Sequence, residues 1–420
     1  MKVCVIGNGG REHALAWRLS ISPSVTKVYA IPGSAAMSDC AELVGIDWQQ
    51  SDHLIRFLKD NHVDLVVVGP EAPLVAGLAD ELNKAGIPVF GPSKAAAQLE
   101  GSKVFAKDLM KKYNIPTAAY GVFHKVDEAK EFIAQTGAPI VVKADGLAAG
   151  KGVVVAMTVE EANAAVEDML SGNRFGEAGS TVVIEEFMEG EEASLLAFVD
   201  GKTVVPMIAS QDHKRIFDGD KGPNTGGMGT YAPAPVLTDA LRDEAMKTIL
   251  EPMVAAMEKE GMPYVGCLYA GLMITPQGPK VVEFNARFGD PETQVVLPLL
   301  DSDLGQIMMA CATGTLTADM VKWKDSSAAC VILASKGYPE TSSKGDVIHG
   351  DIKQHDTTIV FHSGTKLVGE EYVTNGGRVL GVVGLGKDLR TALDRAYGRI
   401  ERIDFEGMQY RTDIGAKAFK

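Results

Sequence analysis

The sequence is poor in cysteine, and no two of its cysteines form a C-x-x-C pair. The five that occur are scattered along 420 residues, several of them inside apolar runs. We therefore predict reduced, buried thiols rather than disulfides or a zinc site, which suits a reducing cytoplasm. These residues are Cys4, Cys40, Cys267, Cys311 and Cys330.

Positive charge is also in deficit, because 41 Lys and Arg face 55 Asp and Glu, for a net charge of -14. This field repels phosphate polymers and acidic membranes, so we expect neither nucleic acid nor a membrane as partner. No apolar run reaches membrane-spanning length, and the N-terminus lacks a signal-peptide layout, so we expect no export. The 46% hydrophobic and 23% charged content indicates a globular protein of two to four domains.

Short apolar β runs alternate with helical patterns from residue 2 to about residue 101. This alternation predicts an open parallel sheet, in which ligands bind beyond the carboxyl ends of the strands. The loops expected there cover residues 7–12, 32–34 and 69–71, and we assign them to a second substrate. The first loop lacks the third small residue of a dinucleotide fingerprint, so a phosphate on the helix N-terminus, near Arg11, is the simpler interpretation.

A break at Ile115-Pro116, after a helical pattern over 102–113, suggests a hinge. Residues 121–186 then read strand, helix, strand, glycine loop, strand, helix, strand, which is typical of a compact lid-sized domain. An apolar run delivers Lys143 to the start of the loop at 144–152, whose glycine N–H groups could approach phosphate oxygens closely. The alternative interpretation of this loop is a mobile surface segment.

Far downstream, Glu283, Asn285 and Arg287 recur at period two, so one strand would point all three to one face. Two hard oxygen ligands and a cation suit magnesium and phosphate. An ordinary polar strand face is the alternative, but its occurrence together with the glycine loop favours a nucleoside triphosphate site.

Two polar segments precede this strand. Residues 218–229 are rich in glycine and proline, which favours an irregular functional loop over a linker. Residues 211–215 are too densely charged for a core strand and could equally form a solvated face. After about residue 326, β-rich runs precede a helix over 389–403, which predicts a small C-terminal α+β domain.

Four motifs, at residues 7–14, 143–152, 211–215 and 283–292, together closely resemble the phosphoribosylamine-glycine ligase family along essentially the whole chain. The resemblance implies an ATP-grasp fold within an α/β and α+β multidomain chain. Its expected parts are an N-terminal open parallel sheet domain (1–101), a core (102–120 and 187–325), a lid (121–186) and a small C-terminal α+β domain (326–420).

The resemblance also implies site residues. Lys103 and Lys143 would bind ATP phosphates, and Glu192 would bind the ribose hydroxyls, with Glu191 as a competitor. Glu283 and Asn285 would hold Mg²⁺ or Mn²⁺. The full set expected to bind ATP is Lys103, Lys143, Gly150, Lys151, Gly152, Glu192 and an adenine edge made of Glu185 with the backbone of Phe187 and Met188.

The implied reaction is the ligation of glycine to 5-phosphoribosylamine in de novo purine biosynthesis, giving glycinamide ribonucleotide, ADP and phosphate. The glycine carboxylate would attack the γ-phosphate of ATP to give a glycyl phosphate, which the amine then attacks, with Lys143 and Arg287 as catalytic residues. Gly9, Gly10 and Arg11 would hold the ribose phosphate and Glu71 a hydroxyl, while the candidates for glycine are Asp212, Lys214 and Arg287. His13, in a first helical turn, is assigned to packing rather than to catalysis.

Two positions depart from the family pattern. Gly271 stands where many ATP-grasp enzymes carry another metal-binding glutamate, and Ser34 stands where asparagine is expected. Rival functions are a nicotinamide-dependent oxidoreductase and an ATP-responsive binding protein without turnover. A monomer is compatible with the sequence.

Overall fold

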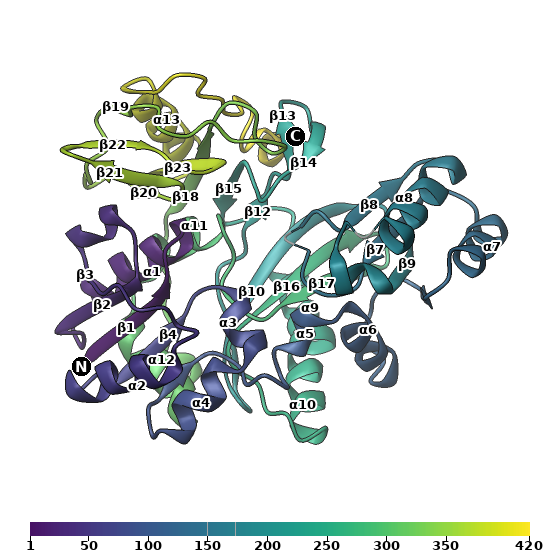
Figure 1. The fold of residues 1–420 in the computed structure, drawn as a ribbon, viewed down its shortest axis with the longest axis horizontal. Helices are drawn as coiled ribbons and strands as arrows, with labels where there is room; N and C mark the ends of the chain where they lie inside the picture. The colour runs from purple at the N-terminus through teal and green to yellow at the C-terminus, as the bar shows by residue number, and fades with distance from the viewer. Residues whose placement is uncertain (149, 173) are drawn as a thin grey trace.

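The computed structural model describes residues 1–148, 150–172 and 174–420, and it confirms the predicted multidomain α/β and α+β class. Figure 1 shows the N-terminal domain at the lower left, the C-terminal domain above it, the lid at the right and a central sheet between them. The arrangement leaves the loops of all four parts facing a common centre.

The N-terminal domain is the predicted open parallel sheet, with strand order β3-β2-β1-β4-β5. Alternate residues of β1 enter two different hydrophobic clusters, so both faces of the sheet are covered, as is usual for parallel sheets. The elements are β1 (Lys2–Gly7), α1 (Gly10–Ser20), β2 (Lys27–Pro32), β3 (Glu42–Leu43), α2 (Ser51–Asp60), β4 (Leu65–Val68), α3 (Glu71–Ala76), α4 (Leu78–Lys84) and β5 (Val89–Phe90).

A short connector, α5 (Gln98–Gly101) and α6 (Lys103–Lys112), leads into the lid. The lid is a four-stranded sheet, ordered β6-β9-β7-β8, with two helices packed on it over a hydrophobic cluster of its own. The pattern predicted for it is confirmed: β6 (Tyr120–Phe123), α7 (Val126–Thr136), β7 (Ile140–Ala144), β8 (Val153–Ala156), α8 (Val159–Ser171) and β9 (Val182–Glu186).

The central sheet has the order β11-β10-β16-β17 and is buried on both sides. Leu195 and Ala197 face one cluster while Leu196 and Phe198 face the other, so the long middle strands carry nearly continuous apolar runs. Its elements and helices are β10 (Glu191–Asp200), β11 (Val204–Pro206), α9 (Asp239–Ala245), α10 (Glu251–Lys259), β16 (Val265–Thr275), β17 (Gly278–Asn285), α11 (Thr293–Val296) and α12 (Leu304–Thr313).

The C-terminal sheet, ordered β12-β15-β18-β23-β20, recruits two strands from before residue 326. The solvated-face interpretation of residues 211–215 is therefore wrong in part, since Gln211 and His213 are buried and Gln211 lies in the edge strand β12. The elements are β12 (Gln211–Asp212), β15 (Gly229–Ala232), β18 (Ser327–Ala334), β20 (Thr358–His362), β21 (Thr365–Val368), β22 (Glu371–Thr374), β23 (Arg378–Gly386) and α13 (Leu389–Ile400).

The segment predicted to be an irregular loop also contains regular structure. Residues 218–229 begin in a two-stranded hairpin of β13 (Arg215–Phe217) and β14 (Lys221–Asn224), and only the part after β14 is irregular. Arg411 ties this hairpin to the chain end, because its guanidinium contacts Asp220, Asp413 and the Arg215 carbonyl. Arg215 and Asp220 lie 196 and 191 residues from Arg411 in sequence, which is why local composition missed the hairpin.

All five cysteines are free thiols, four of them buried and Cys40 half-buried, as predicted. Within the described ranges, no helix has both the length and the apolar character needed to cross a bilayer.

Candidate functional site

The candidate site begins at the end of β7, where Lys143 leaves the lid sheet toward the core. Its ammonium lies 3.0 Å from Oε2 of Glu185 on β9 and donates to the carbonyl of Val282 on β17 at 3.2 Å. Lys107 of α6 lies 3.3 Å from the other oxygen of Glu185. Burial lowers the pKa of Lys107 to about 8, although Glu185 opposes the shift. One buried carboxylate therefore holds two ammonium groups at the junction of lid and core.

Lys103 stands at the first position of α6 and contacts the glycine loop of the lid. Its ammonium donates to Gly146 O at 3.0 Å, and its backbone N–H donates to Oδ1 of Asp145 at 2.6 Å. Burial, with Lys143 nearby, lowers the pKa of Lys103 below its ordinary value. Asp145 thus caps the helix N-terminus and docks the glycine loop beside two lysines.

The glycine loop has the backbone that its composition predicts at two positions. Gly146 and Gly150 adopt φ of +87° and +72°, values that a side chain would strain. Gly152 is buried, and a Cβ there would lie 2.6 Å from Cβ of Ala148, while Lys151 is exposed. Ala149, which belongs to the predicted phosphate motif, lies outside the described residues.

Glu283 and Asn285 both lie on β17, as predicted. Burial alone would raise the pKa of Glu283, but Lys214, Lys143, Lys103 and Arg287 together hold it below its usual range. The positive charges of four residues from separate segments of the chain therefore favour the ionised form of one carboxylate.

The carboxylate of Glu283 and the amide oxygen of Asn285 fit a magnesium ion, which prefers hard oxygen ligands and takes the remaining positions from water and phosphate. Within the described residues, no three His, Cys, Asp or Glu side chains are grouped to hold a metal. Gly271 pairs directly with Glu283 in the sheet, so the glutamate missing at Gly271 would have stood beside this carboxylate.

The prediction that Arg287 lies on the same strand as Glu283 and Asn285 is wrong. β17 ends at Asn285, and Arg287 lies in the bend that follows. Its guanidinium lies 2.9 Å from Oε1 of Glu100 and 3.3 Å from Oε2 of Glu71. Burial opposes the charge of Arg287, but these two carboxylates raise its pKa above the ordinary value.

Glu192 is the second residue of β10, and its side chain lies beside Lys214. Its Oε2 lies 3.5 Å from Nζ of Lys214, and Glu192 is the leading cause that raises the pKa of Lys214. Strand alternation turns the neighbouring Glu191 to the opposite face. Glu185 lies near the end of β9, and Phe187 and Met188 lie in the connection from β9 to β10, so the residues predicted to border adenine and ribose fall within one short stretch of the chain.

An acidic pair lies next to this edge. Burial and the neighbouring charge of Glu292 raise the pKa of Asp212 well above its usual value, although Lys214 opposes the shift. Glu292 is 3% exposed and accepts a hydrogen bond from the Tyr269 hydroxyl at 2.7 Å. Two neighbouring carboxyl groups favour a bound cation, whose positive charge offsets their mutual repulsion.

The N-terminal loop differs from what we expected of a phosphate site. Oδ2 of Asp290 already accepts the Arg11 backbone N–H at 3.2 Å, and the Gly9 N–H donates to Glu12 at 2.8 Å. The Arg11 guanidinium is buried against Oε1 of Glu12 at 2.6 Å and donates to Phe288 O. The first turn of α1 therefore has internal anionic partners, and its assignment to the ribose phosphate stays a prediction.

Two glycines, one at the end of β1 and one directly after β4, leave the space that the Glu12 side chain occupies. A Cβ on Gly7 or Gly69 would lie 2.4 or 2.2 Å from the Glu12 side chain. A carboxylate between the ends of β1 and β4 occupies the region in which a dinucleotide fold places its pyrophosphate, which argues against a nicotinamide cofactor. Beside it, His13 is 2% exposed and accepts the His362 backbone N–H at 3.0 Å, as expected of a packing residue.

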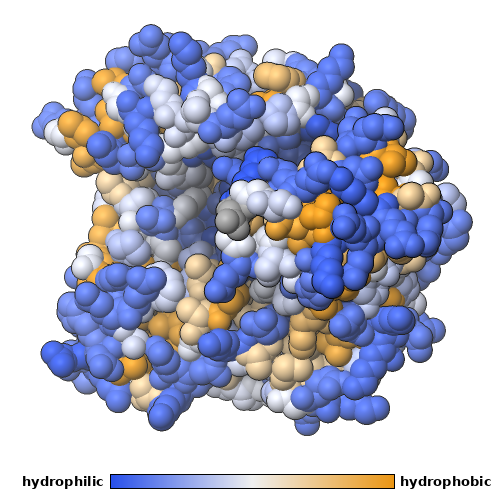
Figure 2. Space-filling view, turned by 45° about the vertical axis from the view of Figure 1, so that its right-hand side comes forward, coloured by the Kyte–Doolittle hydropathy of each residue, from blue (hydrophilic) through white to orange (hydrophobic). Residues whose placement is uncertain are grey.

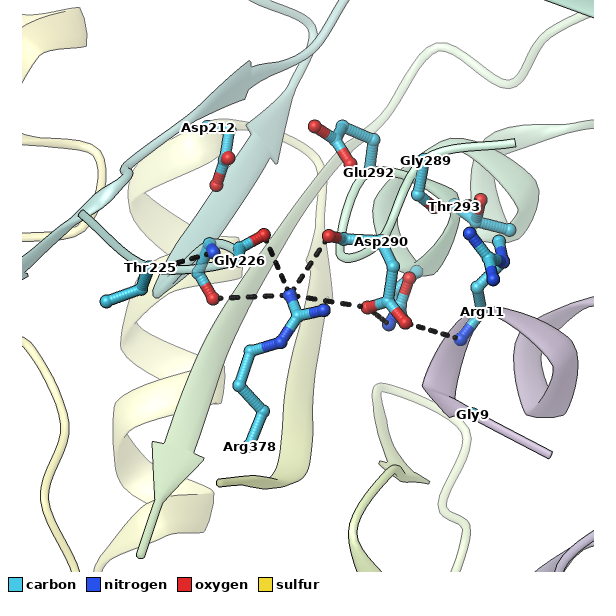
Figure 3. A network of polar contacts seen from close by, with 12 residues as sticks. Gly9, Arg11, Asp212, Thr225, Gly226, Gly289, Asp290, Glu292, Thr293 and Arg378 are labelled. Atoms are coloured by element: carbon cyan, nitrogen blue, oxygen red, sulfur yellow. Dashed lines mark hydrogen bonds and ion pairs between the residues drawn. The ribbon is translucent and has the colours of Figure 1, made fainter. Parts of the chain in front are cut away.

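Residues of the C-terminal domain also contact the first turn of α1 and the turn at Asp290. A Cβ on Gly10 would lie 2.4 Å from Oγ of Ser363, and Arg378 contacts both Gly226 and Asp290 (Figure 3). The space-filling view shows a hollow near the middle of this face, bordered mainly by hydrophilic and neutral residues (Figure 2).

Sequence reasoning missed several residues of the site. Asp290 and Glu292 belong to the motif at 283–292 and could have been singled out as charged residues next to Gly289 and Pro291. Lys107, Glu100 and Arg378 carry no local signal, because their partners are separated from them by 78, 187 and 88 or more residues.

Three comparisons support the architecture described above. Family models of phosphoribosylglycinamide synthetase match the chain in three parts. The N domain matches residues 1–100, the ATP-grasp (A) domain residues 101–293 and the C domain residues 328–417. A phosphoribosylamine–glycine ligase of Halalkalibacterium halodurans is 53% identical over 418 residues, covering 100% of this chain and 97% of the relative.

Solved structures show the same arrangement. The phosphoribosylamine–glycine ligase of Thermotoga maritima is 34% identical, with a TM-score of 0.86 over 99% of this chain and 100% of that chain. The biotin carboxylase domain of the Hydrogenobacter thermophilus 2-oxoglutarate carboxylase, solved with MgADP, is 17% identical, with a TM-score of 0.75 over 97% and 91% of the two chains. The latter likeness concerns the fold alone.

Proposed function

The chain belongs to the phosphoribosylglycinamide synthetase family of ATP-dependent ligases in purine biosynthesis, and we propose that it joins glycine to 5-phosphoribosylamine through a glycyl phosphate. One observation carries the proposal: the Lys143 ammonium of the lid, paired with Glu185 at 3.0 Å, donates to the Val282 carbonyl on β17, directly before Glu283. The products are glycinamide ribonucleotide, ADP and phosphate.

The ATP phosphates would lie between the lid loop and β17. Lys103 and Lys143 lie beside the loop, and Gly150, Lys151 and Gly152 would supply backbone donors and a third cationic contact. Lys143 is held by Glu185 and by Val282 O, so its ammonium is already placed before the nucleotide binds. Such placement favours phosphoryl transfer, which depends mainly on position and charge neutralisation.

Glu283 and Asn285 would hold Mg²⁺ or Mn²⁺ against the phosphates. When bound, the ion neutralises charge on the phosphate oxygens. The low pKa of Glu283 supports this assignment, because the carboxylate is ionised and ready to act as a ligand.

The adenosine would lie along the connector from β9 to β10. Since the Glu185 carboxylate is occupied by Lys107 and Lys143, the backbone of Phe187 and Met188 would contribute most of the adenine edge. Glu192 would accept the ribose hydroxyls, and its ion pair with Lys214 keeps it on the correct face.

Glycine would bind between Arg287 and the acidic pair. Its carboxylate suits the planar fork of Arg287, and its ammonium suits Asp212 and Glu292. Glu71 and Glu100 hold the guanidinium from the far side, so Arg287 presents its remaining donors in a defined direction. The glycine carboxylate oxygen would then attack the γ-phosphorus of ATP, and the bond from that phosphorus to the ADP oxygen would break.

The second step would use the N-terminal domain. Gly9, Gly10, Arg11 and Glu71 lie at the carboxyl ends of β1 and β4, the usual ligand position in an open parallel sheet. From there the amine of 5-phosphoribosylamine would attack the glycyl carbonyl and displace phosphate. A closed lid would limit hydrolysis of the acyl phosphate, and the cytoplasm would be the compartment of this reaction.

The decisive experiment measures ADP release with magnesium, ATP, glycine and freshly generated 5-phosphoribosylamine, omitting each in turn. Turnover that needs both glycine and the phosphoribosylamine supports the proposal. ATP binding without such turnover would favour an ATP-responsive binding protein and overturn it.

A further inference from the structure

Arg378 opens β23 of the C-terminal sheet, yet its guanidinium contacts two loops of the ATP-grasp core (Figure 3). Its Nη1 donates to Gly226 O at 2.9 Å and to Asp290 O at 2.9 Å, and it lies 3.7 Å from Oδ1 of Asp290. Burial opposes the charge, but Asp290 raises the pKa of Arg378 above its ordinary value. One cationic side chain thus joins two loops that are more than 60 residues apart in sequence.

One of these loops leads into Glu292, and the other lies against Asp212 of β12, so both border the acidic pair assigned to glycine. A Cβ on Gly227 would lie 2.6 Å from Cδ of Pro291 and 2.9 Å from Oδ1 of Asp212, and the residue has φ of +126°. The loop therefore fits closely between Asp212 and the turn that leads into Glu292. A shift of either loop would change the separation of the two carboxylates.

Asp290 extends the same chain of contacts into the N-terminal domain. Its Oδ2 accepts the Arg11 backbone N–H at 3.2 Å, and its Oδ1 accepts the Gln294 amide at 2.8 Å. Burial alone would raise the pKa of Asp290, but Arg378 and Arg11 hold it below its usual range. The N-terminal, core and C-terminal domains therefore meet at one ionised carboxylate.

We propose that Arg378 is a positioning residue for glycine: by binding Gly226 and Asp290 it sets the distance between Asp212 and Glu292. The C-terminal domain thereby completes the glycine site without touching the substrate. This inference rests on the proposed function, because it takes glycine to be the ligand of the acidic pair.

The test compares Arg378→Met and Arg378→Lys with the wild-type chain in steady-state assays of ADP release. Loss of both donors in Arg378→Met is expected to raise the KM for glycine about tenfold or more and to leave the KM for ATP within about twofold. Arg378→Lys keeps the charge and one donor group, so it should restore part of the glycine KM.

Arg399→Met is the matched control. Arg399 is a buried arginine of the same domain that binds only groups of that domain, with donors to Asp351 O, Lys353 O and Thr358 Oγ1. Its loss is expected to lower the melting temperature without moving the KM for glycine, which separates damage to the C-terminal domain from loss of positioning.

If Arg378→Met does not fold, Gly226→Ala takes its place, since the added Cβ would lie 2.9 Å from Cζ of Arg378 and displace the guanidinium. It should raise the KM for glycine in the same way. A glycine KM within twofold of wild type in either folded variant, or a parallel rise for ATP, overturns the inference. A wild-type chain that needs no glycine would instead refute the proposed function.

Discussion

The ammonium of Lys143 lies 3.0 Å from Oε2 of Glu185, and the two side chains are 5% and 3% exposed. The pair is not isolated, since Lys107 holds the other carboxylate oxygen at 3.3 Å. Two lysines share one carboxylate, so the region keeps a surplus of positive charge where the phosphates of ATP would lie. Structural pairing and phosphate binding thus use the same side chain.

This relationship predicts the effect of Lys143→Met. We expect kcat to fall by about 10²- to 10³-fold, the usual loss when one donor to a reacting oxyanion is removed. The fold should persist because Lys107 still neutralises Glu185. Steady-state ADP release and a melting curve measure the two effects, with the exposed lid residue Lys125 changed to Met as control. Activity near wild type in a folded Lys143→Met variant would contradict the assignment.

Glu283→Gln tests the metal site. The amide keeps the shape of the side chain but loses the negative charge that attracts magnesium, so the Mg²⁺ concentration for half-maximal activity should rise about tenfold or more. Chelation with EDTA should abolish wild-type turnover, and added Mg²⁺ should restore it. The exposed Glu189, changed to Gln, is the control. An unchanged Mg²⁺ dependence would remove Glu283 from the ligand set.

Asp212→Asn should raise the KM for glycine by about tenfold or more, because a hydrogen bond to a charged group typically contributes about 1.5–3 kcal/mol. The raised pKa of Asp212 adds a pH dependence. As pH falls, a proton competes with the glycine ammonium for the carboxylate, so the wild-type KM should rise, and this rise should be smaller in Asp212→Asn. Glycine KM values at pH 6, 7 and 8 measure it, with exposed Asp239→Asn as control. A pH-independent wild-type KM would contradict this account.

Gly69→Ala tests the close approach of Glu12 to the ends of β1 and β4. The added Cβ would lie 2.2 Å from Oε1 of Glu12, whose position is held by Gly9 and Arg11, so the free energy of unfolding should fall by about 1–3 kcal/mol. Gly45 has no atom within 4 Å of its Cβ position, and Gly45→Ala should be neutral or slightly stabilising. Urea unfolding measures the free energy of unfolding of both variants. Equal values for the two would disprove the packing argument.

Three buried histidines predict a loss of stability below neutral pH. Burial lowers the pKa of His13 to about 3 and of His213 and His362 to about 4, against an ordinary 6.5. Between pH 6.5 and about 4 the unfolded chain binds protons that the folded chain does not, so the free energy of unfolding should decrease as pH falls.

His13→Asn isolates one of these groups, because its amide oxygen can still accept the His362 N–H and does not titrate. The decrease between pH 7 and pH 5 should be smaller than in wild type by about 2 kcal/mol. Urea unfolding at both pH values measures the difference. An identical decrease would show that His13 is not the group that takes up the proton.

Local patterns predicted much of this protein. The alternation of β runs and helices in residues 2–101 gave the correct parallel sheet, and the same reasoning gave the strands and α-helices of the lid, though not the short 3₁₀ helix at Gly176–Ser180. Period-two spacing placed Glu283 and Asn285 on one strand. Both signals depend on neighbours a few positions apart, and burial of one face is enough to make them visible in the sequence.

Local patterns failed where pairing is distant. The hairpin of β13 and β14 exists in a glycine-rich segment because Arg411 binds it from almost 200 residues away. β17 ends before Arg287, whose guanidinium binds Glu71 and Glu100 on other elements. No periodicity could reveal either partner.

The sequence alone thus determined the fold class and the motifs, since repeated backbone geometry and hydrophobic spacing are properties of consecutive residues. Tertiary structure decided which charges meet: Lys107 with Glu185, and Arg378 with Asp290. A buried charge needs a partner of opposite sign within a few ångströms, and many pairings satisfy that need until packing brings particular segments together.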